Sequence, residues 1–274
     1  MVEDLESRQD IDEYAPAESP TYKHVQLDSS GGIVRITLNH PPANLLSTDL
    51  MGELATALES LEYESDTSLV VLLASGKYFS AGFELNDHLG DRAYLMLQGF
   101  RRIFEALAKV DKPTLSVVQG PALGAGCLLA AGCDIVLAAE SAKFAHPEIR
   151  GGVFNAMAAA LLPRLVGRKR AYEMILLGGT LSAAEAQKAG LVTRVGPDDR
   201  LEAETAALIQ RFEESSAPIV QLARRAIAGG LDLPFEEAVE HAEDVYLNQL
   251  TATEDVEEGL RAVVEKRKPA WKGR

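Results

Sequence analysis

A single glutamate in a proline and glycine frame is the residue best suited to acid–base chemistry in this chain. Glu148 follows Pro147 and precedes Gly151 and Gly152. Proline fixes one backbone dihedral, and glycine allows another part of the backbone to approach closely. We therefore expect the Glu148 carboxylate at the edge between a strand and a loop, facing a cavity. The alternative is an ordinary acid on a surface loop.

Two glycine-bearing turns could supply backbone N–H groups near that carboxylate. They are Ala81-Gly82-Phe83 and Gly124-Ala125-Gly126. In one interpretation, the N–H groups of Phe83 and Ala125 point at the same carbonyl oxygen and form an oxyanion hole. In the other, the glycines only let a helix and a strand pack closely. A dinucleotide-binding turn is disfavoured because Leu129 replaces the third glycine and no P-loop Lys-Ser/Thr pair follows.

The segments that must position these turns read as strands alternating with helices. Continuous apolar runs predict buried strands, and apolar residues at helical spacing predict helices. The predicted strands are 24–28, 33–38, 69–73, 115–118 and 134–137, and the main predicted helices are 48–61, 124–132, 156–166 and 168–177. From residue 198 onward the pattern is helical only, with breaks near 215–218 and 229–234 and a closing helix at 254–268. The sequence therefore predicts an α/β core followed by a helical region.

Composition excludes several classes of protein. The chain has 274 residues and a net charge of -14, which disfavours binding to a polyanion such as nucleic acid. Cys127 and Cys133 lie in apolar sequence without the spacing of metal ligands, so we expect buried free thiols and no metal site. No segment reads as a secretory signal or a membrane span, which predicts a cytoplasmic protein. Residues 1–22 are acidic and lack periodicity, so we expect a mobile tail.

Five segments together resemble the enoyl-CoA hydratase/isomerase (crotonase) superfamily. In order, they are FSAG from Phe79, PALGAGC, GCDIVLAAESAKFAHPE, LSAAEAQKAGLV and the terminal EDVEEGLRAVVEKRKPAWKGR. The resemblance spans about His24 to Arg274. It implies a crotonase-like ββα spiral core at 23–195 and a C-terminal helical trimerisation region at 196–274. It also implies trimers or pairs of trimers that act on an acyl-CoA substrate and need no further cofactor.

The resemblance implies roles for the residues of both turns and for Glu148. The thioester oxygen of the substrate would bind the backbone N–H groups of Phe83 and Ala125, and Glu148 would transfer the proton. Family hydratases typically carry a second glutamate where this chain has Leu128. Leucine cannot hold or deprotonate water, so Glu148 acts alone, another group substitutes, or the reaction is not simple enoyl hydration. An isomerase that uses one glutamate and a non-catalytic CoA-binding homologue are the alternatives.

A finer resemblance concerns the segments ELNDHL at 84–89 and PEIRGGVFNAMAAALLPRLVG from Pro147. They are similar to alicyclic dienoyl-CoA hydratases, which add water to cyclohexa-1,5-diene-1-carboxyl-CoA. In that case the Leu128 side chain could pack against the ring of the substrate. Further candidates for the substrate pocket are Asp87, His88, His146 and Asn155, each of which could instead serve only local structure.

Two residues are expected to contact the CoA moiety. Lys266 matches a family lysine that reaches the nucleotide phosphates, often those bound to a neighbouring subunit, and Ala81 is the first residue of the first turn. Lys266 could instead be only a cation at the end of a helix, where it is worth up to about 1 kcal/mol.

Overall fold

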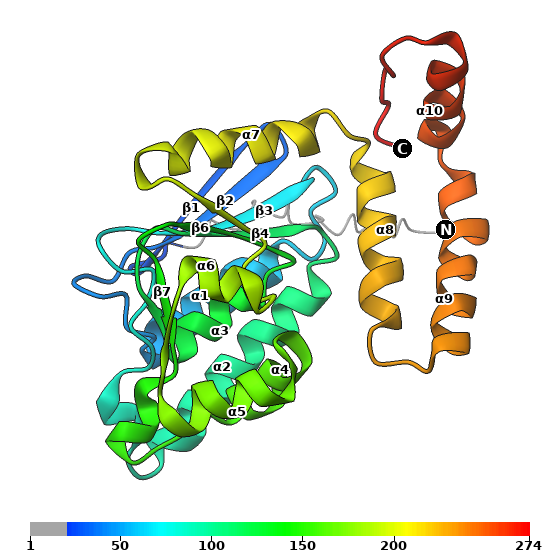
Figure 1. Cartoon of the computed structure of the whole chain (residues 1–274). Coiled ribbons are helices and arrows are strands. Elements are labelled where there is room, and N and C mark those ends of the chain that lie inside the picture. Colours follow the sequence, from blue (N-terminus) through cyan, green and yellow to red (C-terminus); the bar gives the residue numbers. More distant parts are fainter. Residues whose placement is uncertain (1–20) are drawn as a thin grey trace, which may run out of the picture.

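A largely parallel sheet carries the α/β part of the molecule (Figure 1). The computed structural model describes residues 21–274, so the expected acidic tail at 1–22 lies outside the described residues except for Thr21 and Tyr22. Strands β1 and β2 form an antiparallel hairpin, and each later strand pairs in parallel with its neighbour. The order across the sheet is β1 (Val25–Ser30), β2 (Ile33–Leu38), β3 (Leu69–Ala74), β4 (Thr114–Val118), β6 (Ile135–Ala139) and β9 (Arg194–Gly196).

Helices cover both faces of this sheet, which explains why its strands read as continuous apolar runs. On one face, Val71 and Val117 pack in the same buried cluster as Leu208 of α7 (Leu201–Glu213). On the other face, α1 (Thr48–Ser60), α2 (Arg92–Lys109) and α3 (Ala125–Ala131) share a second buried cluster with β2, β3 and β4. Ser47 caps α1 by accepting a hydrogen bond from the Leu50 N–H.

A second, small sheet positions the segments that were singled out for chemistry. It has the order β5 (Ala122–Leu123), β7 (Lys143–Ala145) and β8 (Thr180–Ser182). Strand β5 leads into the turn at Gly124, and β7 leads into the 3-10 helix η2 (Pro147–Gly151) that carries Glu148. Ser182 and Glu185 form a capping box at the start of α6 (Ala183–Lys188).

The chain after β9 is helical. Figure 1 shows α8 (Ala217–Gly230), α9 (Phe235–Asn248) and α10 (Glu254–Glu265) standing to one side of the α/β part. The prediction that the last helix continues to residue 268 is wrong: it ends at Glu265 because Lys266 turns into the left-handed conformation, with a φ of 55°. The remaining elements are α4 (Ala156–Leu165), α5 (Gly167–Leu177), η1 (Leu85–His88), η3 (Asp198–Arg200) and η4 (Leu250–Ala252). Within residues 21–274, no helix has the length and apolar character needed to cross a membrane.

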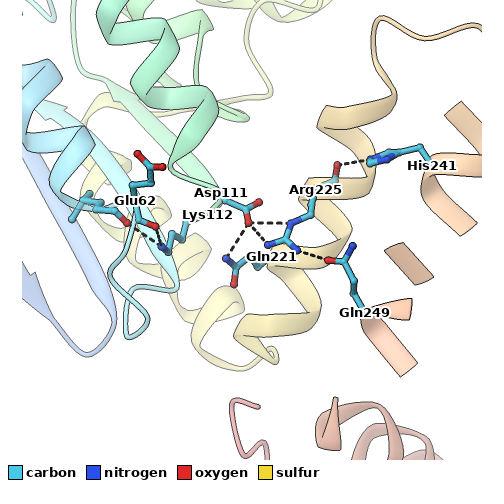
Figure 2. A network of polar contacts seen from close by, with 8 residues as sticks. Glu62, Asp111, Lys112, Gln221, Arg225, His241 and Gln249 are labelled. Carbon is cyan, nitrogen blue, oxygen red and sulfur yellow. Dashed lines mark hydrogen bonds and ion pairs between the residues drawn. The ribbon is translucent and has the colours of Figure 1, made fainter. Parts of the chain in front are cut away.

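A polar network fixes α8 against the α/β part (Figure 2). The Arg225 Nε donates to the Asp111 carboxylate at 3.1 Å, and the same guanidinium also donates to Gln249 beyond α9. One residue earlier, the Arg224 Nε donates to Asp134 at 2.8 Å. Adjacent arginines on one helix therefore bind two separate carboxylates of the core.

Candidate active site

The two glycine-bearing turns are in direct contact. The Leu123 N–H donates to the Ser80 carbonyl oxygen at 2.9 Å, which joins the first turn to β5. A Cβ added at Gly126 would lie 2.5 Å from that same carbonyl oxygen, a distance that no side chain allows. Glycine at 126 is therefore required for the two turns to meet.

The backbone N–H groups of Phe83 and Ala125 lie in these turns without an acceptor among the described residues. The Leu46 N–H donates to the Gly82 carbonyl at 2.8 Å and the Glu84 N–H donates to the Leu46 carbonyl at 3.4 Å. This pairing directs the Phe83 N–H away from Leu46. Ala125 is the first residue of α3, where backbone N–H groups have no partner within the helix. Its nitrogen lies 3.6 Å from the position that a Cβ on Gly82 would take, so the Ala125 N–H group lies close to the first turn.

The Glu148 carboxylate lies against the second turn. A Cβ at Gly124 would be 2.4 Å from Glu148 Oε1, and Gly124 has a φ of 55°. The Glu148 side chain is only 14% exposed, and its Oε1 has no hydrogen-bond partner among the described residues. A partly buried carboxylate and the N–H group of Ala125 thus flank the same glycine.

A cavity of about 440 Å³ opens at this point. Among the residues predicted from the sequence, Ala81, Phe83, His88 and Glu148 line it. His88 also packs its ring edge-on against Phe83, with the ring centroids 5.8 Å apart. The remaining lining residues are Gly82, Leu85, Asn86, Leu89, Gly124, Pro147, Gly151 and Val153.

The other predicted pocket residues do not line this cavity. Leu128 is fully buried in the apolar cluster beneath the sheet, because that side of α3 faces the core. Asp87 is buried and accepts a hydrogen bond from the Thr48 Oγ1 at 3.4 Å, at the start of α1. The Asn155 Oδ1 caps α4 by accepting from the Met157 and Ala158 N–H groups. Lys266 follows the end of α10 and is not among the lining residues.

His146 is placed behind Glu148 instead of in the cavity wall. Its side chain is 2% exposed, and its Nδ1 lies 3.6 Å from Glu148 Oε1. Burial alone would lower the pKa of His146, but the Cys127 sulfur and the Glu148 carboxylate outweigh burial and raise the pKa to about 9. The sequence placed His146 near the site, but it gave no sign that Cys127 of α3 would lie beside its ring.

The predicted free, buried thiols are confirmed for Cys127 and Cys133. Burial raises the pKa of Cys133 to about 12, which leaves that thiol unreactive. Within residues 21–274, no group of three or more His, Cys, Asp or Glu side chains is arranged to hold a metal ion.

Comparison with known proteins gives a consistent result. The family model for enoyl-CoA hydratase/isomerase matches residues 28–274. A probable enoyl-CoA hydratase of Rhizobium meliloti is 37% identical over 257 residues, covering 93% of this chain and 100% of that protein. The 2,3-dehydroadipyl-CoA hydratase of Escherichia coli is 34% identical and covers 88% and 96% of the two chains. These relatives agree with the expectation of an enzyme in the hydro-lyase class.

Solved structures of related proteins confirm the predicted fold. The crystal structure of an enoyl-CoA hydratase from Bacillus anthracis superposes with a TM-score of 0.86 at 31% identity, covering 92% of this chain and all of that chain. An enoyl-CoA hydratase structure from Mycobacterium smegmatis gives a TM-score of 0.87, also at 31% identity, and covers 91% and 99% of the two chains. The expected α/β core with its helical C-terminal region is therefore the crotonase fold, and the chain belongs to the enoyl-CoA hydratase/isomerase family.

Proposed function

We propose that this protein is a hydratase that adds water across the double bond of an unsaturated acyl-CoA thioester. The observation that carries the proposal is the meeting of Glu148 with the two turns. The carboxylate lies against Gly124, the unpaired N–H group of Ala125 follows that glycine, and Phe83, whose N–H group is also unpaired among the described residues, lines the same cavity as Glu148. Addition to an enoyl thioester needs a proton carrier near the carbon atoms and hydrogen-bond donors near the oxygen that becomes negative.

One carboxylate is sufficient for the proton transfers of hydration. As the water oxygen forms a bond to the β-carbon, the ionised Glu148 takes one water proton and the π electrons move to the thioester oxygen. The N–H groups of Phe83 and Ala125 stabilise this enolate, which they bind more strongly than the neutral carbonyl. The enolate then takes the proton from Glu148 at the α-carbon, so the product gains one H and one OH. No electrons are exchanged with another molecule, so we propose that no redox cofactor takes part.

The second acid of family hydratases is absent at position 128, and the cavity wall offers other polar groups. His88 and Asn86 line the cavity along with Glu148. Their side chains can hydrogen-bond a water molecule without taking its proton. We propose that they hold the attacking water, the role in which Leu128 cannot serve.

For the acyl group we propose an uncharged ring such as cyclohexa-1,5-diene-1-carboxyl-CoA. The segments at 84–89 and from Pro147 that resemble alicyclic dienoyl-CoA hydratases both contribute to the cavity wall. Leu85, Leu89 and Val153 make this wall largely apolar. A dehydroadipyl group ends in a carboxylate, which needs a cation when it is removed from water. No Lys or Arg is among the described residues that line the cavity.

The test is turnover of a panel of CoA esters: the cyclic diene, crotonyl-CoA and 2,3-dehydroadipyl-CoA. We expect loss of conjugated absorbance, fastest with the cyclic diene, and a fall of about 10²–10⁴-fold in kcat for Glu148→Gln, typical of losing a general acid–base group. Normal turnover by this variant would remove Glu148 from the mechanism. Preference for the dicarboxylic ester would overturn the assignment of the acyl group.

An isomerase is the second candidate, because double-bond migration needs one acid–base group and no water. The leucine at position 128 favours this reading. Turnover in water enriched in oxygen-18 separates the two candidates: a hydratase builds the isotope into its product, and an isomerase does not. Binding of the whole panel without turnover of any member would instead indicate a non-catalytic homologue.

We propose that copies of the chain associate through the C-terminal helices, as trimers or pairs of trimers. Large apolar side chains are exposed there in the single chain, including Ile227, Leu231, Phe235, Leu260, Val263 and Val264. Exposed apolar surface of this kind marks a site of association. We further propose that Lys266, beyond the end of α10, contacts the CoA phosphates bound to a neighbouring copy.

A further inference from the structure

His146 and Glu148 form a buried pair that the proposed reaction does not by itself explain. The Nδ1 of His146 is 3.6 Å from Oε1 of Glu148, and Oε1 is the oxygen that lies against Gly124. Both ring nitrogens of His146 are buried without a hydrogen-bond partner among the described residues, and the same holds for Glu148 Oε1. An isolated buried polar group is costly, so each of these groups needs the other.

The surroundings favour a charged imidazolium at this position. Among the described residues, the titratable groups that act on the His146 ring are Cys127 from α3 and Glu148 from η2. The guanidinium of Arg150 packs at Gly178, beside the backbone carbonyl oxygen of His146. Burial lowers the pKa of His146, but Cys127 first and Glu148 second outweigh burial and raise it to about 9. The Glu148 carboxylate, 3.6 Å from Nδ1, is the group with a negative charge to pair with the protonated ring.

We propose that His146 is a positioning residue that acts through Glu148: its imidazolium pairs with Oε1 and holds the carboxylate against Gly124. This inference rests on the proposed function, in which Glu148 must begin the cycle as a base. His146 does not line the cavity, so it touches neither the substrate nor the attacking water. Its effect is on the orientation of its neighbour.

The first test needs no substrate and therefore stands apart from the proposed function. NMR of the imidazole ring follows the titration of His146 in the wild type and in Glu148→Gln. The chain has five histidines, and His→Gln substitution at the other four assigns the signal of His146. We expect the pKa of His146 to fall by about one unit or more when the carboxylate is neutralised, the effect of removing an opposite charge at close range. An unchanged His146 pKa would overturn the proposal even if the enzyme is a hydratase.

The second test is the pH profile of kcat/KM for His146→Gln, on whichever ester the wild type converts. Without the imidazolium, the Glu148 carboxylate loses the partner that holds it against Gly124, so kcat/KM should fall wherever the wild-type ring is charged. The ratio of wild-type to variant activity should be about tenfold at the acidic end. It should shrink as the pH rises through about 9, where His146 itself loses its charge.

The control is His24→Gln, a half-buried histidine outside the cavity wall. It should leave both limbs of the profile in place. A His146→Gln activity loss of the same size at every pH would indicate a structural role only and would overturn the proposal. If no ester is converted, the proposed function fails, and the NMR titration still decides the pairing of His146 with Glu148.

Discussion

At the scale of single residues, the site depends on close approach between the Glu148 side chain and the glycine-bearing turns. The position of Glu148 at a cavity could be predicted from the sequence, because its proline and glycine frame is a local feature. The roles of His146 and Leu128 could not, because both depend on how α3 lies against η2 and the sheet. Leu128 points into the core, and Cys127, one residue earlier, reaches His146. Both residues are fully buried in the same cluster, and only the fold shows that Cys127 also lies beside His146.

Gly124 should be indispensable for activity. In Gly124→Ala, the new Cβ would lie 2.4 Å from Glu148 Oε1, so the carboxylate must move away from the cavity. We expect kcat to fall about 100-fold or more, because small misplacements of a catalytic group are costly. Gly31→Ala is the matched control, since Gly31 has a φ of 60° and open space around its Cβ position. Both variants should lose stability by about 1–3 kcal/mol, because each places a Cβ in a backbone conformation that L residues rarely adopt. Equal activity in the two would contradict this account.

The stability of the protein should depend on the charge of His146. Its pKa is about 9 in the folded protein and 6.5 ordinarily, so the folded state holds a proton that the unfolded state releases between these values. The stabilisation is full below pH 6.5 and is lost as the pH rises through 9. Each pKa unit corresponds to about 1.4 kcal/mol, which sets an upper limit of about 3 kcal/mol. The free energies of unfolding of the wild type and His146→Gln, measured by denaturant titration, should differ most at the acidic end. A difference between these free energies that is constant with pH would refute the pairing.

At the scale of elements, sequence periodicity predicted the long strands and helices but not the short ones. The strands β3 and β4 were predicted within one residue of their observed ends. Strands β5, β7 and β8 span two or three residues, too few to show alternation, and they are defined by pairing between distant segments. The end of α10 was also missed, because Lys266 turns left-handed without a glycine to mark the position.

Asp255 joins the elements of the C-terminal region and should be sensitive to neutralisation. Its buried carboxylate accepts hydrogen bonds from the Ser216 Oγ at 2.6 Å, the Lys272 N–H at 2.7 Å and the Gly273 N–H at 3.1 Å. Burial raises its pKa, but these hydrogen bonds outweigh burial and lower it below 3.8. Asp255→Asn should therefore cost about 1.5–3 kcal/mol at neutral pH, typical of hydrogen bonds to a charged group.

The pH dependence of this loss has a definite sign. A depressed pKa stabilises the fold above the ordinary value of 3.8, and the stabilisation is lost as the pH falls through the folded value. The unfolding free energies of the wild type and Asp255→Asn should thus converge as the pH falls below 3.8. The control is Asp199→Asn, an exposed position without a hydrogen bond to its side chain among the described residues. An Asp255→Asn loss that persists at low pH would mean that shape, and not charge, matters there.

At the scale of the whole molecule, the α/β part and the C-terminal helices differ in how they treat apolar residues. The α/β part has two buried apolar clusters on the faces of the sheet, although it also exposes large apolar side chains such as Leu85, Leu89 and Leu177. Helices α8, α9 and α10 bury few apolar side chains, namely Leu222, Val245 and Ala262, although Arg224 and Arg225 bind α8 to the core. A helical arm with an apolar surface has the character of an interface between copies.

Breaking this surface should change the mass of the assembly. Leu260, Val263 and Val264 lie three and four positions apart on α10, so they share one face of the helix, and Val263 and Val264 are 77% and 82% exposed. We expect sedimentation of the wild type to give at least three times the chain mass of 29.5 kDa. The double variant with Val263→Asp and Val264→Asp should sediment with the mass of a single chain. Placing carboxylates in an apolar interface is costly because they lose their hydration. Leu27→Asp, on the partly exposed strand β1, should leave the assembly unchanged.

If Lys266 serves a neighbouring copy, the single chain should also show a raised KM for CoA esters. A wild type that sediments as a single chain would refute both the interface and that role of Lys266.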